Sequence, residues 1–269
     1  MPTDQQTYAF RNARAAQRRR LETLEALLDD GSTRILAARG VAPGWSCLEV
    51  GGGGGSIARW LAERVGPEGT VLATDLDTTV LAESAAPNLE VRAHDVLTDD
   101  LPVGAFDLVH LRLVLAWLAD PALALERLVA ALKPGGVLVA EEMDFASVAP
   151  DPRVDPGARA AFERYVEGHH AVLRDRHAFD RFYGRRVAGD LAASVLVDVG
   201  CEGRVGMWRG DDAGGLVWRL SLEQLRDGLV DGGYAEAADL DVVAAALADP
   251  GFSFMSQVTM AAWGRRPVT

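Results

Sequence analysis

The order of apolar and polar residues predicts two helices at the start of the chain. The first spans residues 7–29, where leucines recur at helical spacing: Leu21, Leu24, Leu27 and Leu28. We expect it to end at Asp29-Asp30-Gly31. A second, short helix is predicted from Thr33 to Arg39, closed by Gly40 because glycine tolerates the positive φ of a helix C-terminus. Residues 1–40 are therefore predicted to form an N-terminal helical lid.

From Trp45 onward, short apolar runs typical of strands alternate with helical patterns. The predicted strands are residues 47–50, 70–74, 88–93, 106–111 and 137–140. Between these strands we expect three helices. The first follows the first strand and has Ile57, Trp60, Leu61 and Val65 on its buried face. The second covers residues 78–85, and the third begins after Asp120-Pro121. This alternation predicts β-α-β units and a parallel sheet covered by helices on both faces.

The alternation stops after Asp144. Residues 146–157 are rich in Pro and Asp and are expected to form a loop. The remaining predicted elements are one or two helices over 158–183, a helix at 186–199, a strand at 201–208, helices at 222–230 and 235–248, and a strand at 252–264. We therefore expect a core of residues 41–145 and 186–269, with a helical insertion at 213–250 and a helical cap at 146–185.

The most informative chemistry lies between Cys47 and Ala58, where a strand runs into five consecutive glycines and then a helix. Glycines at 51, 53 and 55 allow positive φ and let a ligand approach the backbone with no Cβ in the way. Glu49, two residues before Gly51, would repel a phosphate but attract hydroxyl, ammonium or sulfonium groups. This combination predicts a site for a nucleoside that carries no pyrophosphate.

Two other nucleotide-binding motifs fit this segment poorly. A P-loop requires a lysine after its glycines, and no lysine lies between Glu49 and Ala82. A dinucleotide motif that starts at Gly51 needs a third glycine where Ser56 stands, and one that starts at Gly52 needs it at Ile57. A nicotinamide-dependent oxidoreductase is therefore disfavoured.

Polar side chains stand where the predicted strands end. They are Glu49, Asp75, Asp95, His110 and Glu142. Because ligands of open α/β sheets bind outside the carboxyl ends of the strands, we expect these residues to surround one cleft.

These segments resemble the class I S-adenosylmethionine-dependent methyltransferases, most closely the small-molecule branch. The matching motifs are Leu48-Glu49-Val50-Gly51 with Gly53 and Gly55, Ala73-Thr74-Asp75-Leu76-Asp77, Ala93-His94-Asp95-Val96, Phe106-Asp107-Leu108-Val109-His110 and Leu132-Lys133-Pro134-Gly135-Gly136. The similarity covers residues 44–143 and, more loosely, the last two predicted strands. It implies an α/β, Rossmann-like sheet of seven mostly parallel strands, with helices on both faces and the last strand antiparallel.

The resemblance implies S-adenosylmethionine as the cofactor and assigns residues to its methionine end. Glu49 would hold a water molecule or the ammonium group beside the glycine turn. Gly51 and Gly53 would let the methionine and ribose pack on the backbone. The backbone around His110 and Leu111 would receive the ammonium group.

Other residues are assigned to the nucleoside end and to the lid. Asp75 would accept both ribose hydroxyls, because a carboxylate offers two acceptor oxygens to a vicinal diol. Asp95 would accept from the adenine N6 amino group, while Leu76 and Val96 sandwich the base. For both acids a structural alternative stays open, since each could cap the helix that follows it. Tyr8 or an arginine of the first helix would fold over the cofactor's carboxylate.

The expected reaction is an in-line displacement at the methyl group of a sulfonium, in which the enzyme mainly aligns the reactants and excludes water. An oxygen or nitrogen acceptor must also lose a proton, so a general base is expected. The candidates are Glu142, His169, His170 and His177, although paired histidines on a polar helix are also common at surfaces. Glu141-Glu142-x-Asp144 lacks a second cluster of ligands, so no metal is predicted.

Composition narrows the partners. The net charge of −12 argues against nucleic acid and anionic membranes, and no apolar run approaches a membrane span, so we expect a cytoplasmic protein. Cys47 and Cys201 lie in apolar contexts that do not suggest a disulfide.

The expected substrate is a small molecule, aromatic or polyketide-like, and a homodimer stays open. The alternative function is a protein of the same fold that binds S-adenosylmethionine without methylating, as a regulator or as a catalyst of rearrangement or cyclisation.

Overall fold

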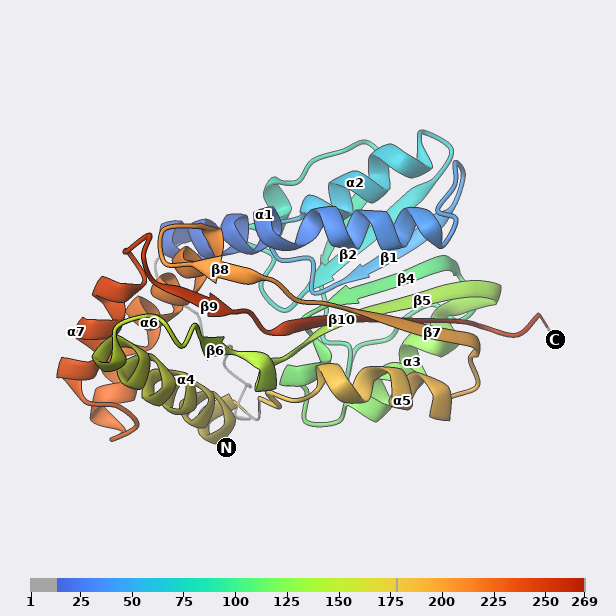
Figure 1. Ribbon diagram of the computed structural model, residues 1–269. Coiled ribbons are helices and arrows are strands. Elements are labelled where there is room, and N and C mark those ends of the chain that lie inside the picture. Colours follow the sequence, from blue (N-terminus) through green and yellow to red (C-terminus); the bar gives the residue numbers. More distant parts are fainter. Residues whose placement is uncertain (1–13, 178, 269) are drawn as a thin grey trace, which may run out of the picture. The chain divides into compact units, whose positions relative to one another are not determined.

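The computed structural model describes residues 14–177 and 179–268, and Tyr8 and the rest of the first 13 residues lie outside this range. The chain divides into two compact units (Figure 1). The first, called here the sheet unit, comprises Leu28–Asp144, Phe182–Arg204 and Thr259–Thr269. The second, called the helical unit, comprises Met1–Leu27, Phe145–Arg181 and Val205–Val258.

The sheet unit is built on a seven-stranded sheet. Its strands are β1 (Ser46–Val50), β2 (Thr70–Asp75), β3 (Leu89–Ala93), β4 (Phe106–Arg112), β5 (Leu132–Asp144), β7 (Val197–Arg204) and β10 (Val258–Arg265). They follow the order β3-β2-β1-β4-β5-β10-β7. The pairs β1–β2, β2–β3, β1–β4 and β4–β5 are parallel, and β10 runs antiparallel to β7. The predicted Rossmann-like fold is confirmed.

Helices cover both faces of this sheet. The part of α1 (Arg14–Ala38) that belongs to the sheet unit lies with α2 (Ser56–Val65) on one face, and α3 (Pro121–Ala131) and α5 (Gly184–Ala193) lie on the other (Figure 1). Ile35 and Leu36 of α1 share a buried cluster with Leu61 of α2 and Leu108 of β4. As predicted, the carboxylate of Asp120 caps α3, accepting from the backbone N–H of Leu123 at 2.9 Å.

The prediction that the first helix stops at Asp29-Asp30-Gly31 is wrong, because α1 is one helix from Arg14 to Ala38. A glycine inside a helix costs only about 1 kcal/mol relative to alanine, and packing overrides it. A Cβ on Gly31 would lie 2.1 Å from Nη1 of Arg204, so the glycine makes room for that guanidinium. Gly40, with φ of 92°, follows the helix end as predicted.

Two other helix predictions were too long. Residues 78–85 form turns around one short 3₁₀ helix, η1 (Leu81–Glu83), because the β-branched run at Thr78, Thr79 and Val80 disfavours a regular helix. The helix predicted at 186–199 is α5, which ends at Ala193. There the hydroxyl of Ser194 donates to the carbonyl of Leu191 and accepts from the N–H of Leu196, which stops the helix before β7.

The strands predicted at 201–208 and 252–264 are each divided between two sheets. The first range contains the end of β7 and the start of β8 (Met207–Arg209), and the second contains β9 (Ser253–Met255) and β10. Gly206 and Ser256 stand at the two breaks, where the Gly206 N–H donates to the Ser256 hydroxyl at 3.1 Å and the Ser256 N–H donates to the Gly206 carbonyl at 2.9 Å. These bonds replace a continuous ladder.

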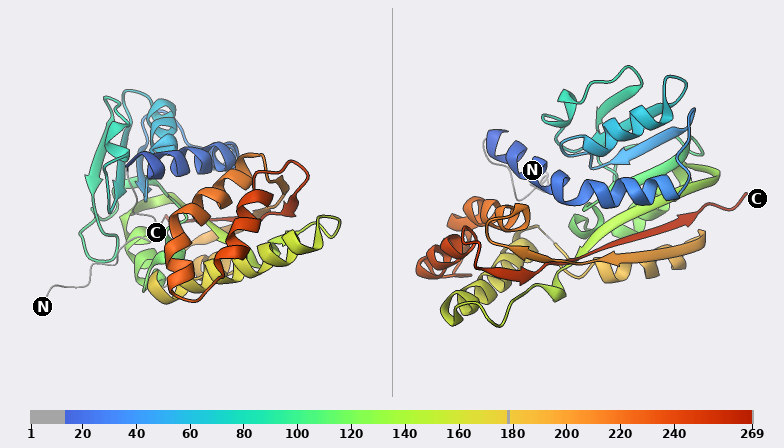
Figure 2. Two further views of the ribbon diagram at one scale, coloured as in Figure 1. Left: turned by 90° about the vertical axis from the view of Figure 1, so that its left-hand side faces the viewer. Right: turned by 45° about the horizontal axis from the view of Figure 1, so that its top comes forward.

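Among the described residues, the helical unit contains the first part of α1, three whole helices and a small antiparallel sheet. The helices α4 (Pro156–His177), α6 (Ala213–Asp231) and α7 (Ala237–Ala246) pack together (Figure 2). The sheet has the order β6-β9-β8, with β6 at Ala149–Pro150. Two short 3₁₀ helices complete the chain, η2 (Leu115–Trp117) in the sheet unit and η3 (Phe145–Ser147) in the helical unit. Among the helices described, none has the length and apolar character to cross a membrane.

Candidate functional site

The glycine turn lies directly after β1. Gly51, Gly53 and Gly55 have φ of 69°, 55° and 84°, the positive region that favours glycine. The N–H groups of Gly51 and Gly52 donate to the carbonyl of Thr74 at 2.8 and 3.0 Å, which ties the turn to β2. A Cβ on Gly51 would lie 2.4 Å from Cγ2 of Val114, so the backbone also approaches the segment that follows β4.

Asp75 ends β2 and closes the turn from the other side. Its Oδ2 accepts from the N–H of Gly53 at 3.0 Å, and its Oδ1 accepts from the N–H of Asp77 at 3.2 Å. Burial raises the pKa of Asp75, while these backbone N–H groups act to lower it. The next residue, Leu76, is apolar yet 56% exposed. An acceptor carboxylate and an uncovered apolar side chain therefore stand together at the end of β2.

Asp95 lies beyond the neighbouring strand end. Asp75 pairs with Ala93 of β3, and the N–H of His94 donates to the carbonyl of Asp75 at 3.0 Å. Oδ1 of Asp95 accepts from the N–H of Leu97 at 2.9 Å, as in a local turn. Val96 is buried, so Leu76 offers the larger exposed apolar surface of the predicted pair.

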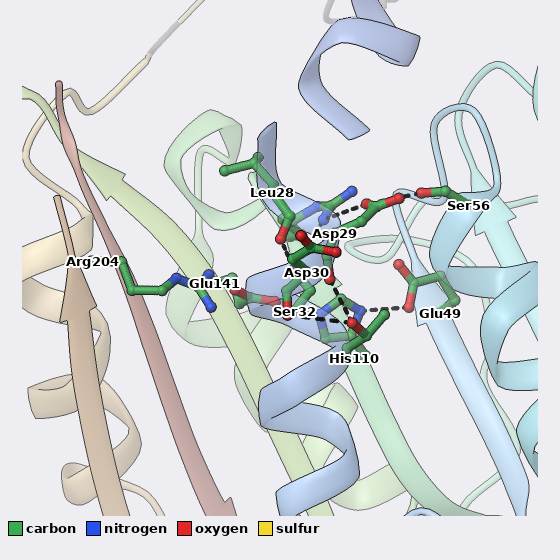
Figure 3. Close-up of polar contacts among 11 residues, drawn as sticks. Leu28, Asp29, Asp30, Ser32, Glu49, Ser56, His110, Glu141 and Arg204 are labelled. Atoms are coloured by element: carbon green, nitrogen blue, oxygen red, sulfur yellow. Dashed lines mark hydrogen bonds and ion pairs between the residues drawn. The ribbon is translucent and has the colours of Figure 1, made fainter. Parts of the chain in front are cut away.

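A cluster of charged side chains lies under the strand ends (Figure 3); Glu49, His110 and Glu141 are buried and Arg204 is partly buried, and we call it the buried charge cluster. Glu49 of β1 and His110 of β4 are register partners, and Oε2 of Glu49 lies 2.6 Å from Nδ1 of His110. The other ring nitrogen, Nε2, lies 3.2 Å from Oε1 of Glu141 on β5. Arg204 of β7 donates from Nη2 to Oε2 of Glu141 at 2.6 Å.

The pKa values of His110 and Glu141 are displaced from their ordinary values. Burial acts to lower the pKa of His110, but the charge of Glu49 and the hydrogen bond with Glu141 outweigh it and raise that pKa to about 9. Burial acts to raise the pKa of Glu141, but its hydrogen bond with His110 and the positive charges nearby lower it to about 2. The cluster thus favours the charged forms of His110 and Glu141, although both side chains are buried away from water.

Helix α1 joins the site through Asp29 and Ser32 (Figure 3). Arg112, at the end of β4, donates from Nη1 to Oδ1 of Asp29 at 3.0 Å and to the Ser32 hydroxyl at 2.9 Å. The hydroxyl of Ser56, the first residue of α2, donates to Oδ1 of Asp29 at 3.1 Å. A carboxylate of α1 is therefore bonded to the residue that directly follows the five glycines.

The three acids at the end of β5 have different partners. Glu141 belongs to the buried charge cluster, whereas Oε1 of Glu142 accepts from the N–H groups of Val114 and Leu115 at 3.0 and 2.6 Å. Asp144 accepts from Nη2 of Arg185 at 2.9 Å. Glu142 is therefore not an exposed acid. It holds in place the segment after β4 that faces Gly51.

His169 and His170 lie in the helical unit, inside an aromatic cluster. The ring centroid of His170 is 4.7 Å from that of Phe145, and that of His169 is 5.2 Å from that of Trp218. Burial lowers the pKa of His169 to about 3 and that of His170 to about 2. Nδ1 of His170 lies 3.3 Å from Nη1 of Arg181, and within the described residues its buried Nε2 has no hydrogen-bond partner.

The structure therefore brings together the residues predicted at the glycine turn and those at the strand ends of the sheet unit. Asp75 is bonded to Gly53, Glu49 to His110, and Leu111 is fully buried beside them in β4. Sequence reasoning missed four contributors: Asp29, Ser32, Glu141 as a partner of His110, and Arg204. The sequence feature that could have pointed to Glu141 is its position two residues after Val139, the residue that pairs with His110 in the register of β4 and β5.

Comparisons with known proteins agree with this architecture. Residues 48–140 match the family described as "Methyltransferase domain". The methyltransferase str3 of Strobilurus tenacellus is 29% identical over 157 residues, which are 58% of this chain and 54% of the relative. The trans-aconitate 2-methyltransferase of Deinococcus radiodurans is 33% identical over 139 residues, 51% of this chain and 47% of the relative. The chain spans about half the length of the curated relatives it matches.

The fold is shared with solved methyltransferase structures. The phosphoethanolamine N-methyltransferase 2 of Haemonchus contortus, solved with phosphomonomethylethanolamine and S-adenosylhomocysteine, is similar with a TM-score of 0.55 and 16% identity, over 88% of this chain and 52% of that chain. Over residues 48–140, which include the glycine turn after β1, the chain is similar to the methyltransferase domain family, and its seven-stranded sheet has the fold of solved methyltransferases.

Proposed function

We propose that this protein transfers a methyl group from S-adenosylmethionine to a small-molecule acceptor. The observation that carries the proposal is the carboxylate of Asp75, fixed by the N–H of Gly53 at 3.0 Å and followed by the exposed Leu76. A carboxylate that meets a glycine turn suits ribose hydroxyls, and an exposed apolar side chain beside it suits a flat base.

The residues present fit this cofactor. The positive φ values at Gly51 and Gly53 leave the backbone open to a ligand, and Glu49 supplies a negative charge that suits an ammonium group. When bound, S-adenosylmethionine supplies a methyl group on a positively charged sulfur. We propose that Asp75 holds the ribose, that Asp95 recognises the adenine amino group, and that the remaining contacts follow the family pattern at Leu76, Val96, His110 and Leu111, with Tyr8 and residues 1–40 as the lid.

On the acceptor side, we propose that orientation contributes more than proton removal. His169 and His170 are neutral at pH 7 and accept protons weakly, because burial holds their pKa values at about 3 and about 2. A guanidinium only donates hydrogen bonds, so Nδ1 of His170, which faces Arg181, carries the lone pair of the ring, and the ring proton is on Nε2. His170 would then donate a hydrogen bond, and Glu142 would hold the segment after β4 in place.

The acceptor is proposed to be an aromatic or polyketide-like metabolite, handled in the cytoplasm. The cap at 146–185 would face it. The proposed class of acceptor is supported by the curated relatives. One of them is a nocamycin O-methyltransferase of Saccharothrix syringae, which is 33% identical over 110 residues, 38% of this chain and 39% of that protein.

The test has two stages. Calorimetry with S-adenosylmethionine and S-adenosylhomocysteine, alongside NAD and NADP, should show binding of the first pair only. Incubation with S-adenosylmethionine and a panel of small aromatic and polyketide-like acceptors should then release S-adenosylhomocysteine together with a product heavier by one methyl group. Absence of binding would overturn the cofactor assignment, and binding without release on any acceptor would favour the alternative of a non-methylating protein.

A further inference from the structure

His110 is the one member of the buried charge cluster that contacts two carboxylates. Its side chain is fully buried, and both ring nitrogens lie within hydrogen-bond distance of a carboxylate oxygen, 2.6 Å to Glu49 and 3.2 Å to Glu141. An ionised carboxylate can only accept hydrogen bonds, so each ring nitrogen has to carry a proton. The geometry therefore specifies an imidazolium.

The charges of the cluster balance. Glu49 and Glu141 carry two negative charges, and His110 and Arg204 carry two positive ones. The charged groups next to it form two further pairs, Arg112 with Asp29 and Arg34 with Glu202. A buried ion pair is stable only where its partners and hydrogen bonds are complete, so removing the charge of His110 would leave two buried carboxylates without their shared donor.

Glu49 uses only one of its oxygens in this arrangement. Oε2 bonds to His110, whereas Oε1 has no hydrogen-bond partner among the described residues and points away from the imidazole (Figure 3). Glu49 is in β1 and is followed after one residue by the glycine turn at Gly51. The imidazolium therefore sets which oxygen of Glu49 remains available beside that turn.

We infer that His110 is a positioning residue, which fixes the carboxylate of Glu49 so that Oε1 can accept from the ammonium group of S-adenosylmethionine. This inference rests on the proposed function. It assigns a role to the His110 side chain, in addition to the backbone contact that the family pattern gives this position. It also makes recognition of the amino-acid end of the cofactor depend on a buried proton.

Two ligands separate this role from a general structural one. S-adenosylhomocysteine carries the amino-acid end, whereas 5′-methylthioadenosine keeps the adenosine and the sulfur but lacks the ammonium and carboxylate groups. In His110→Gln, calorimetry at pH 7 should show S-adenosylhomocysteine binding weakened by about tenfold or more, the loss of one charge-assisted hydrogen bond, with 5′-methylthioadenosine binding changed by less than about threefold. Equal losses for both ligands would overturn the inference.

A second variant guards against unfolding of the first. Glu141→Gln keeps the pair between Glu49 and His110 but removes one of the charges that raise the pKa of His110, so its imidazole should lose its proton at lower pH. Ring ¹⁵N chemical shifts should show a doubly protonated His110 in the wild type through pH 8 and a titrating one in the variant. The same spectra show which ring nitrogen loses its proton. Loss from Nδ1 removes the donor to Glu49, so the ratio of variant to wild-type affinity for S-adenosylhomocysteine should fall over that pH range, whereas loss from Nε2 leaves this donor in place and the ratio should stay constant. The ratio for 5′-methylthioadenosine should stay constant in both cases.

The outcomes are distinct. If Nδ1 of His110 loses its proton in Glu141→Gln but affinity for S-adenosylhomocysteine does not fall with it, or if affinity falls although Nδ1 keeps its proton, the positioning role is refuted. A wild-type His110 with only one ring proton at pH 7 would refute it as well. If the wild type binds neither ligand, it is the proposed function that fails.

Discussion

The close approach of Gly51 to Val114 makes Gly51→Ala a sharp test of the site geometry. Gly51 has φ of 69°, and a Cβ there would lie 2.4 Å from Cγ2 of Val114. Gly104 provides a matched control, because its φ is 64° but a Cβ there would meet nothing within 4 Å. The two substitutions thus impose the same kind of backbone cost and differ in the contact.

The magnitudes can be worked from these two positions. An L-residue with left-handed backbone costs about 1–2 kcal/mol, which applies to both variants. Carbon atoms normally stand about 3.5–4.0 Å apart, so the added methyl at Gly51 must displace a stiff β-branched side chain. Overpacking of this kind costs about 1–3 kcal/mol more. Because about 1 kcal/mol lowers the melting temperature of a chain of this size by about 2–4 °C, Gly51→Ala should melt about 2–12 °C below Gly104→Ala.

The assay is thermal unfolding of the wild type, Gly51→Ala, Gly104→Ala, Val114→Ala and the double variant Gly51→Ala/Val114→Ala. The double variant removes Cγ2, so it should recover most of the difference between the two single variants, after correction for Val114→Ala alone. Calorimetry with S-adenosylhomocysteine should show weaker binding for Gly51→Ala and unchanged binding for Gly104→Ala. If both single variants melt together, or if Val114→Ala gives no rescue, the close approach is not a constraint on the folded protein.

The remaining predictions concern the ribose acid, the lid, a helix cap and the buried proton. Asp75→Ala should weaken S-adenosylmethionine binding by about tenfold or more in calorimetry, since the ribose loses both acceptor oxygens, and unchanged affinity in a folded variant would remove Asp75 from the site. Deletion of residues 1–20 should loosen cofactor binding with the core still folded by circular dichroism, and equal binding would refute the lid. Asp120→Ala should lower the free energy of unfolding in urea by about 1 kcal/mol through loss of the α3 cap, and a change in cofactor affinity would contradict this purely structural role. Because the pKa of His110 is raised from 6.5 to about 9, its contribution to stability is complete below pH 6.5 and is lost as pH rises through about 9. The free energy of unfolding, measured in urea, should therefore fall over this pH range in the wild type and fall less in His110→Gln.

Periodicity predicted the parallel part of the sheet because each strand there is a short apolar run between helices. The run at 47–50 and the one at 70–74 correspond to β1 and β2 within one residue. The residue pattern along the chain could not show that the ranges 201–208 and 252–264 each change sheets. That change depends on the bonds between Gly206 and Ser256, which lie 50 residues apart.

The site was predictable where its residues are close in sequence or mark strand ends. Gly53 and Asp75 are 22 residues apart within one β-α-β unit, so the motif carries their contact. The buried charge cluster has no such signal, since Glu141 meets an arginine 63 residues away on β7. The Asp-Asp-Gly run that includes Asp29 predicts a helix stop, whereas the carboxylate of Asp29 accepts hydrogen bonds from Arg112 and Ser56.

The place of β10 in the sheet has a consequence for how the protein is made. β10 lies between β5 and β7, and β7 has no other partner among the described strands. Until residue 258 has left the ribosome, β5 keeps an open edge and β7 cannot join the sheet, although all the other strands of that sheet already exist. An unpaired edge next to a buried apolar strand is a site for wrong association of nascent chains. Completion of the sheet, and with it the supply of Arg204 to the buried charge cluster, therefore waits until β10 has been made.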